Sequence, residues 1–344
     1  NELYMLGEDF TAIETRLLEK TARILTPDIL TSALPAHGVV HASPIEPGYL
    51  ITKESGMYYE NDLLTQKLSA GSISFYPACD TLLHKADVKY MVCDDILYQV
   101  DHTLSKTMIA RTETRMPART VWLGLTVDDS LTDLENISFY LDFPNLTESY
   151  EYLFLLPCTE WSAGGNPIRM EPGIYEKSRL PEESTRAFFR SYDVMSVIDK
   201  EVMELYNKHF LRVSQPVPLN EVDKEPLPKA LSSCFGERVR EKMQEKLVWV
   251  KIVFPAHFTP EILEELHAGI NIVPVENKLL HEQTTSLEDT FRVIPLRTGN
   301  YESLLSVHSV KDSDGKSYHE LQYPVPGSTE LRHLFHPQGR LRAF

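Results

Sequence analysis

The residues of this chain whose type and spacing are best suited to chemistry are two pairs of histidines. His333 and His336 are three residues apart, so on a helix they would face one metal ion. No cysteine or carboxylate lies near them at the spacing of a zinc site, and we therefore predict ordinary surface histidines. His37 and His41 are four residues apart in a segment that we predict to be extended, where they share a face without converging on a site.

Acid–base and phosphate-binding chemistry has even less support. Asp94 and Asp95 are adjacent, and adjacent strand residues point to opposite faces, which argues against a shared carboxylate site. The sequence contains no G-x-x-x-x-G-K-[ST], G-x-G-x-x-G, G-x-S-x-G or H-E-x-x-H motif, and its 15 glycines form no phosphate-binding cluster. We therefore predict a non-enzymatic protein with no catalytic, metal-binding or cofactor-binding residues.

Composition narrows the class of partner. A formal net charge of −16 argues against binding to nucleic acid or to an anionic membrane surface, because both need stripes of Lys and Arg. No apolar run approaches the roughly 20 residues that span a bilayer, so we predict no direct membrane insertion. The four cysteines show no C-x-x-C spacing, which is typical of reduced thiols in a reducing compartment.

The elements that would position these residues are mostly strands. Residues 8–25 have apolar side chains at helical spacing and predict an amphipathic helix. Runs of Val, Ile and aromatic residues predict strands, because such side chains fit a pleated, half-buried surface. The predicted strands and strand pairs are 39–52, 72–76, 88–93, 96–100, 120–127, 137–143, 247–254, 270–275, 291–294 and 303–310.

Two proline-containing segments and one long helix complete the prediction. Pro274 lacks an N–H group, so its strand is expected at a sheet edge or at a bulge. A helix is expected from Pro181 to about Val213, and its apolar heptad spacing fits either helix–helix pairing or an ordinary core-facing helix. Residues 215–228 are rich in proline and polar residues and predict a linker.

These patterns predict an α+β protein of several subdomains, in which antiparallel β subdomains follow an N-terminal helical entry and are joined by long helices. No strand–helix alternation of a doubly wound enzyme is present. The expected divisions are a helical segment 1–36, a β-rich subdomain 37–180, a helical segment 181–246 that includes the linker 215–228, and a β-rich subdomain with a tail, 247–344.

The order of several segments resembles the TssF family, the baseplate wedge subunits of type VI secretion systems. A Pro-Val-x-Asn core is present at Pro274, Val275 and Asn277, although Ile272, Lys278 and Leu279 replace the family's Cys, Leu and Phe. The family's "F-x-E-K-F-x-F" strand is absent from the middle of the chain, and we expect the family's C-terminal portion to be absent too. The matching segments are Arg16–Ala22, Leu34–Pro44, Thr120–Val127, Ile137–Phe143, Leu247–Phe254, Phe258–Leu263, Ile270–Leu279, Phe291–Pro295 and Leu305–Val310.

The resemblance implies an architectural role. TssF proteins assemble with TssG, TssK and TssE around the VgrG spike hub, usually as two copies for each TssG. They support sheath assembly and the triggering of contraction. The resemblance therefore implies a cytoplasmic protein that is docked at the inner membrane through the baseplate. The linker 215–228 would then act as a hinge. The alternatives are the wedge protein of another contractile injection machine, a metal-dependent hydrolase, or a β-sandwich binding module.

The candidate contact residues come from the segments that resemble the family, from the heptad spacing of the long helix, and from Trp161. Trp161 lies in a Gly-rich segment that predicts a loop, where it is either packed locally or an interface anchor. Trp122 and Trp249 lie inside strand runs and are expected in the core. The interface candidates are Arg16, Leu17, Leu18, Trp161, Phe188, Met195, Val202, Pro274, Val275 and Asn277.

Overall fold

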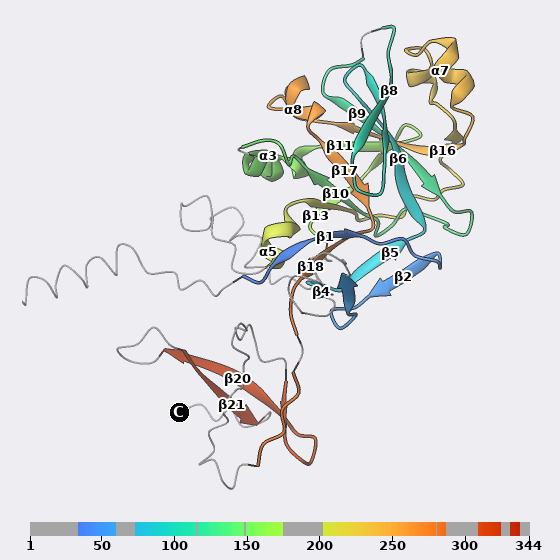
Figure 1. Cartoon of the computed structure of the whole chain (residues 1–344). Coiled ribbons are helices and arrows are strands. Elements are labelled where there is room, and N and C mark those ends of the chain that lie inside the picture. The colour runs from blue at the N-terminus through green and yellow to red at the C-terminus, as the bar shows by residue number, and fades with distance from the viewer. Residues whose placement is uncertain are drawn as a thin grey trace, which may run out of the picture. The chain divides into compact units, whose positions relative to one another are not determined.

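The computed structural model describes residues 34–59, 73–114, 116–147, 149–174, 202–279, 281–286, 309–324 and 331–337. The chain divides into two units, one formed by residues 34–284 and the other by residues 1–33 together with 285–344. The described residues form antiparallel sheets with a few short helices (Figure 1). This confirms the predicted α+β class, whereas the expected long connecting helices are not found among the described residues. The predicted helix 8–25 and strand 291–294 lie outside the described residues.

The 34–284 unit is built around an eight-stranded sheet. Its central strands come from sequence runs that the β-propensity pattern predicts, and Thr120–Val127 has the predicted bounds. The strand at 247–253 pairs with the strand at 120–127. Two strands that we assigned to different subdomains, 37–180 and 247–344, are therefore neighbours in one sheet. The strands, in spatial order, are β12 (Asn166–Ile168), β11 (Glu160–Ala163), β16 (Leu247–Val253), β9 (Thr120–Val127), β6 (Ala86–Cys93), β7 (Ile96–Val100) and β8 (Lys106–Arg111), with β15 (Lys224–Glu225) also beside β16.

A second sheet packs on one face of the first to form what we call the large sandwich. Alternate residues of both sheets meet in the main core, for example Leu123 of the first sheet and Phe139 of the second. This alternation is what a sheet produces when one of its faces is buried. The second sheet runs β13 (Met170–Pro172), β14 (Phe210–Val213), β10 (Ser138–Asp142) and β17 (His267–Ile270).

Short helices cover the other face of the eight-stranded sheet. Trp249 and Leu247 point to this face and join a second apolar cluster with Phe235. The Trp249 indole donates hydrogen bonds to the carbonyls of Glu225 and Pro226, at 3.1 and 3.3 Å, so its polar atom is satisfied in the core. The covering helices are α6 (Lys229–Ser232) and α7 (Glu237–Lys242).

Gly124 makes room for this tryptophan. A Cβ atom at Gly124 would lie 3.0 Å from the nearest Trp249 ring atom. We therefore expect Gly124→Val to destabilise the unit by about 1–3 kcal/mol, because overpacking displaces the ring. Chemical denaturation measures this loss. Gly165→Val is not a suitable control, since Gly165 has φ +87°. Gly38→Val is suitable, because an added Cβ would meet nothing within 4 Å, and an equal loss in both variants would contradict the prediction.

The helix predicted from residue 181 to about Val213 is shorter than expected at its end. Helix α5 (Val202–Asn207) stops at Asn207, and β14 begins at Phe210. Leu211 and Val213 join the main core, whereas Phe210 packs in a third cluster on the outer face of the second sheet. Burial on both faces and pairing with two neighbouring strands override the helical spacing. Residues 175–201 lie outside the described residues.

A smaller pair of sheets, which we call the small sandwich, completes the 34–284 unit. Its core contains Ile51, Leu83, Val273 and Val275. The predicted strand–turn–strand at 39–52 is confirmed as two strands, one in each sheet. The strands are β1 (His37–His41), β18 (Ile272–Glu276), β4 (Ile73–Pro77) and β3 (Met57–Tyr59) in the four-stranded sheet, and β2 (Gly48–Ile51) with β5 (Thr81–His84) in a two-stranded ribbon.

The position of Pro274 differs from its prediction. Strand β18 lies between β1 and β4, without a register shift toward β1, so Pro274 is neither at an edge nor in a bulge. Its carbonyl accepts a hydrogen bond from the Ala78 amide at 2.8 Å. A residue in an antiparallel ladder directs its N and C=O to the same side. The missing N–H therefore faces the point just beyond the end of β4 at Pro77, where the ladder no longer needs a donor.

The predicted linker 215–228 is part of the folded body. Its apolar residues Val217, Leu219, Val222 and Leu227 are buried. The Leu219 amide donates to the Thr132 carbonyl at 2.9 Å, and β15 within the segment pairs with β16. The hinge hypothesis for this segment is therefore wrong, because its prolines alternate with side chains that fill the core.

Residues 309–324 and 331–337 belong to the other unit and form a three-stranded antiparallel sheet. His333 and His336 lie in a strand, so the helical spacing that would direct both at one ion does not arise. The strands are β19 (Val310–Lys311), β20 (Ser317–Pro324) and β21 (Leu331–Pro337).

The remaining helices are short. Among the described residues no helix has the length and apolar character needed to cross a membrane. These helices are α3 (Ser149–Leu155), the 3₁₀ turn η1 (Leu156–Cys158) and α8 (Pro260–Glu264).

Candidate functional site

Trp161, the predicted loop anchor, is buried in the main core. It lies in β11, donates its indole N–H to Thr159 Oγ1 at 2.7 Å, and packs on Phe139 with ring centroids 4.9 Å apart. Gly164 and Gly165 both have positive φ and close a two-residue turn between β11 and β12. Gly-Gly is a hairpin signal as well as a loop signal, which explains why composition alone predicted a loop.

The other described interface candidates also contact their own chain. Val202 is buried in α5, and Pro274 and Val275 are buried in β18. Asn277 is half-buried, and its side-chain amide donates to the Ser74 carbonyl at 2.8 Å. These residues are structural in the 34–284 unit and do not form a free surface. Arg16, Leu17, Leu18, Phe188 and Met195 lie outside the described residues.

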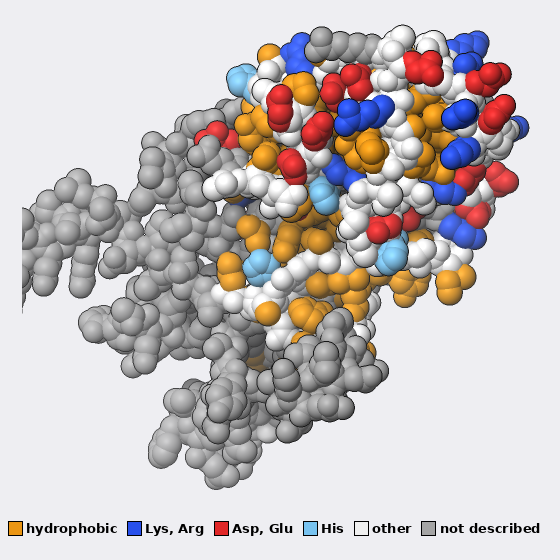
Figure 2. All heavy atoms as spheres, turned by 45° about the horizontal axis from the view of Figure 1, so that its top comes forward, with side chains coloured by type: hydrophobic (Ala, Val, Ile, Leu, Met, Phe, Trp, Pro, Cys, Tyr) orange, Lys and Arg blue, Asp and Glu red, His pale blue; other side chains and the backbone are white. Residues whose placement is uncertain are grey.

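Exposed apolar side chains gather instead on the small sandwich and its flanks. Eight of the ten large apolar residues that are exposed in the described part of the chain belong to this region, and Met108 and Ile109 on β8 are the other two. In Figure 2 hydrophobic side chains gather along the lower border of the described atoms, whereas charged side chains dominate the upper part. The eight are Leu34, Val40, Ile45, Tyr49, Leu50, Tyr58, Leu82 and Leu279.

The two-stranded ribbon is apolar on both faces. Ile51 and Leu83 point into the small sandwich and are buried, at 7% and 2% exposure. On the outward face Leu50 and Leu82 stand opposite each other in the β2–β5 register and are 53% and 41% exposed. An antiparallel pair with one face in water normally carries polar residues there. We call Leu50 and Leu82 the ribbon surface. It is the candidate contact site, because exposed apolar patches mark interaction surfaces.

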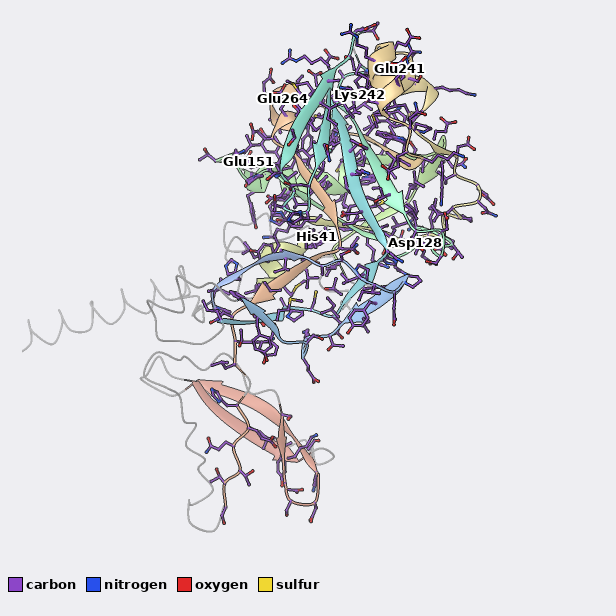
Figure 3. All side chains as sticks on the ribbon, turned by 45° about the vertical axis from the view of Figure 1, so that its right-hand side comes forward. His41, Asp128, Glu151, Glu241, Lys242 and Glu264 are labelled. Carbon is purple, nitrogen blue, oxygen red and sulfur yellow. The ribbon has the colours of Figure 1, made fainter. Side chains whose placement is uncertain are left out.

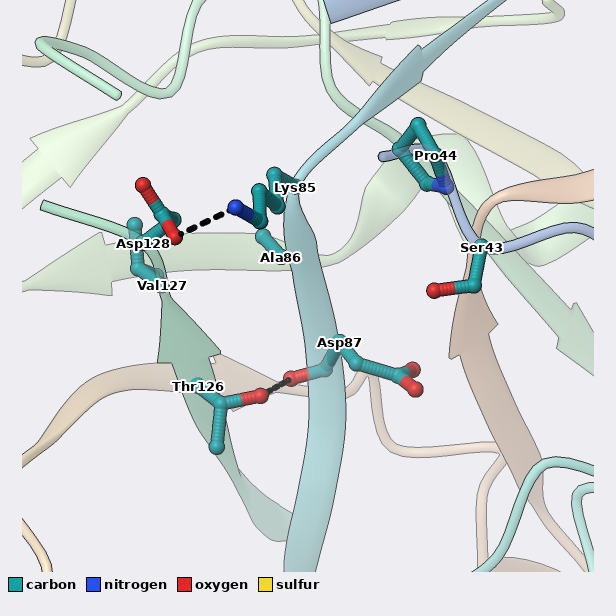
Figure 4. A pocket seen from close by; sticks show the side chains of 8 residues that line it. All are labelled: Ser43, Pro44, Lys85, Ala86, Asp87, Thr126, Val127 and Asp128. Atoms are coloured by element: carbon teal, nitrogen blue, oxygen red, sulfur yellow. Dashed lines mark hydrogen bonds and ion pairs between the residues drawn. The ribbon is translucent and has the colours of Figure 1, made fainter. Parts of the chain in front are cut away.

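A shallow depression of about 330 Å³ lies where the small sandwich meets the large one. Lys85 Nζ forms an ion pair with Asp128 Oδ2 at 3.0 Å, and Thr126 Oγ1 donates to the Asp87 carbonyl at 3.2 Å (Figure 4). Hydrogen bonds from the Ser130 side chain and amide, and then from Lys85, hold the pKa of Asp128 well below its usual range. Because Lys85 is paired with Asp128, the lining of the depression offers no unpaired cation to a ligand. It is lined by Ser43, Pro44, Lys85, Ala86, Asp87, Thr126, Val127 and Asp128.

The arrangement that most resembles an acid–base pair joins Asp142 of β10 to His209, the residue just before β14. Asp142 Oδ1 is 3.4 Å from His209 Nδ1, and the Tyr140 hydroxyl donates to Asp142 Oδ2 at 3.0 Å. Burial acts to raise the pKa of Asp142, but the hydrogen bond from His209 and the others bring the pKa below its ordinary value. Tyr140 and His209 stack at 5.3 Å between ring centroids. Both Asp142 oxygens are engaged, so these contacts connect strands and present no free base.

The histidines and aspartates considered from the sequence have separate partners. His37 Nδ1 is 3.0 Å from the Tyr206 hydroxyl, and His41 Nε2 is 3.4 Å from Asp87 Oδ2. Asp95 Oδ1 accepts a hydrogen bond from the Met116 amide at 2.9 Å. Among the described residues no three His, Cys, Asp or Glu side chains come together as a metal site. Figure 3 shows charged residues such as Glu241, Lys242 and Glu264 far from His41 and Asp128.

Neither the Asp142–His209 contact nor the ribbon surface could be predicted from the sequence. Asp142 and His209 are far apart in the chain, and only the β10–β14 pairing brings them together. For the ribbon surface the signal is the continuous apolar run Tyr49–Leu50–Ile51, which does not tell which face is packed. No protein-family model and no curated protein matches this chain.

Proposed function

We propose that this protein is a structural subunit of the baseplate of a contractile injection machine, of the TssF type. In this role it assembles with TssG-like, TssK-like and TssE-like subunits and a second copy of itself around a VgrG-type spike hub. The assembly lies on the cytoplasmic side of the inner membrane. It performs no catalysis and has no cofactor.

The observation that carries the proposal is the pairing of the segments that resemble the family. The segment around His37–His41 lies beside the segment around Pro274–Asn277, as β1 beside β18, with His37 opposite Glu276 and His41 opposite Ile272. Likewise β9 pairs with β16. Their adjacency supports a common structural framework.

Co-purification tests the proposal directly. The full chain and a TssG-like subunit from the same genome are expressed together, with the tag on the partner, and the complex is analysed by size-exclusion chromatography. We expect a stoichiometric complex and poor solubility of the chain alone. A monomer that binds none of the baseplate subunits and turns over a small molecule contradicts the proposal.

The ribbon surface is the described region on which partner binding is expected to depend. We expect the double variant Leu50→Asp/Leu82→Asp to weaken binding to the TssG-like subunit at least about tenfold, because two desolvated apolar anchors become charges (about 1.4 kcal/mol for each factor of ten). The thermal midpoint should change little, since both side chains are exposed.

Met108→Asp is the matched control, because Met108 is an exposed apolar residue on β8, at 57% exposure. Titration calorimetry or interferometry measures all three affinities. Equal weakening by the control and the double variant, or full binding by the double variant, contradicts a role for the ribbon surface.

A further inference from the structure

The described chain passes between the small and large sandwiches at two points. At the first, Lys85 alone separates β5 of the small sandwich from β6 of the large one. At the second, Asn271 alone separates β17 from β18. One-residue connections leave no slack, so the two crossings determine how the sandwiches sit on each other within the 34–284 unit. Figure 1 shows β17 leading into β18, and β5 into β6, at this junction.

Asn271 joins the two crossings with its side chain. Its Oδ1 accepts from the His84 amide at 2.9 Å, and its Nδ2 donates to the carbonyls of His84 and Ala86 at 2.7 and 2.8 Å. Its own carbonyl accepts from the Ala42 amide at 2.9 Å. Asn271 has φ +58°, which asparagine tolerates better than most residues. The side chain thus replaces a strand that is missing between the crossings.

The imidazole of His84 lies in the same junction. The residue as a whole is only 8% exposed. It forms a hydrogen bond with the backbone of Asn136, in the connection between β9 and β10. Its Nε2 is buried and has no hydrogen-bond partner among the described residues. A neutral ring tolerates a bare lone pair there, whereas protonation would place an unpaired N–H and a charge in the junction.

The charged groups around His84 offer little compensation. Asp133 acts to raise the pKa of His84, but burial outweighs it and the net pKa is lowered. Lys85 is paired with Asp128, and Asp87 lies beside His41. His267 on β17 also has its pKa lowered, first by burial and then by Lys106. A test must therefore separate His84 from His267.

We propose that Asn271 and His84 form a proton-sensitive clamp that holds the small sandwich on the large one, closed while the imidazole is neutral and opened by its protonation. This inference does not depend on the proposed function. Above the unfolded-state histidine pKa of about 6.5, the His84 imidazole is neutral in both the closed and the open form, and the clamp has its full strength. As the pH falls below this value, the open form binds a proton first, and the closed form is disfavoured by up to about tenfold per pH unit until the lowered pKa is reached.

Amide hydrogen exchange of the full chain between pH 7.5 and 5 tests the clamp. The reporters are the His84 and Ala42 amides, which Asn271 holds, and the Leu125 amide in central strand β9 is the reference. After correction for intrinsic exchange, we expect reporter protection to fall by up to about tenfold per pH unit below 6.5, relative to the reference. Asn271→Gly keeps the positive φ and the backbone bond to the Ala42 amide but removes the side-chain bonds, so the His84 amide should be weakly protected at every pH.

His84→Leu and His84→Gln remove the titrating group and keep the backbone bonds to Asn271. At least one of them should give reporter protection that does not change with pH, while His267 still titrates. The same pH dependence in both variants overturns the role of the proton. Protection of the His84 amide in Asn271→Gly equal to that of the unaltered chain overturns the clamp itself.

Discussion

Phe258→Ala is expected to destabilise the 34–284 unit by about 3–5 kcal/mol. Phe258 is 1% exposed and lies in a cluster of aromatic rings, with centroids 4.9 Å from Phe254, 5.4 Å from Tyr152 and 5.9 Å from Phe143. These rings come from three separate segments of the main core, so the side chain fixes the α8 region against the second sheet. Truncation removes the buried area and leaves a cavity that rigid neighbouring strands cannot close.

Urea denaturation followed by far-ultraviolet circular dichroism measures this loss. His257→Ala is the matched control, because His257 is the exposed neighbour on the same connection. It should change the unfolding free energy by less than about 0.5 kcal/mol. If Phe258→Ala were as stable as the control, the main core would not extend to this connection.

Glu171→Leu is expected to cost about 3 kcal/mol, because it leaves the charge of Arg212 without its carboxylate. Arg212 is 6% exposed and stands directly opposite Glu171 in the β13–β14 register. Its Nη2 donates to Glu171 Oε2 at 3.2 Å and its Nη1 to Asn136 Oδ1 at 2.7 Å, whereas its Nε is buried without a partner among the described residues. Because the guanidinium is already incompletely paired, loss of its carboxylate partner leaves a buried charge uncompensated and lowers the stability strongly.

A double-mutant cycle decides this prediction. Arg212→Met removes the charge, and the combination Glu171→Leu/Arg212→Met should recover most of the stability lost by Glu171→Leu alone. The unfolding free energies of the four proteins come from denaturant titration at neutral pH. Additive losses in the double variant would show that the two side chains act independently and would contradict the ion pair.

Local sequence predicted most strands correctly where a continuous run of β-branched and aromatic residues was long enough. Thr120–Val127, Ser138–Asp142 and Leu247–Val253 are such runs, and they lie in the middle of their sheets. Most of their side chains are buried on both faces of the sheets. The α+β class followed from the same signal.

Local sequence failed where tertiary contacts changed the meaning of a pattern. Residues 215–228 have the composition of a linker, but Leu219 and its apolar neighbours are buried against the main core. Phe210–Val213 continues a helical spacing, yet two neighbouring strands convert it to a strand. Trp161 was predicted in a loop for the same reason. A Gly-Gly pair closes a hairpin only when the residues on either side of it pair as strands, and such pairing is not visible in the local sequence.

By itself the sequence determined that this chain is acidic, rich in antiparallel strands and without recognisable catalytic motifs, because these properties depend on residue type and short spacing. Only the tertiary structure decided which strands are neighbours, which face of the β2–β5 ribbon remains exposed, and where Asn271 meets His84. The physical reason is that strand pairing joins residues far apart in the chain. Their contacts depend on the register and packing of whole sheets, which no local pattern specifies.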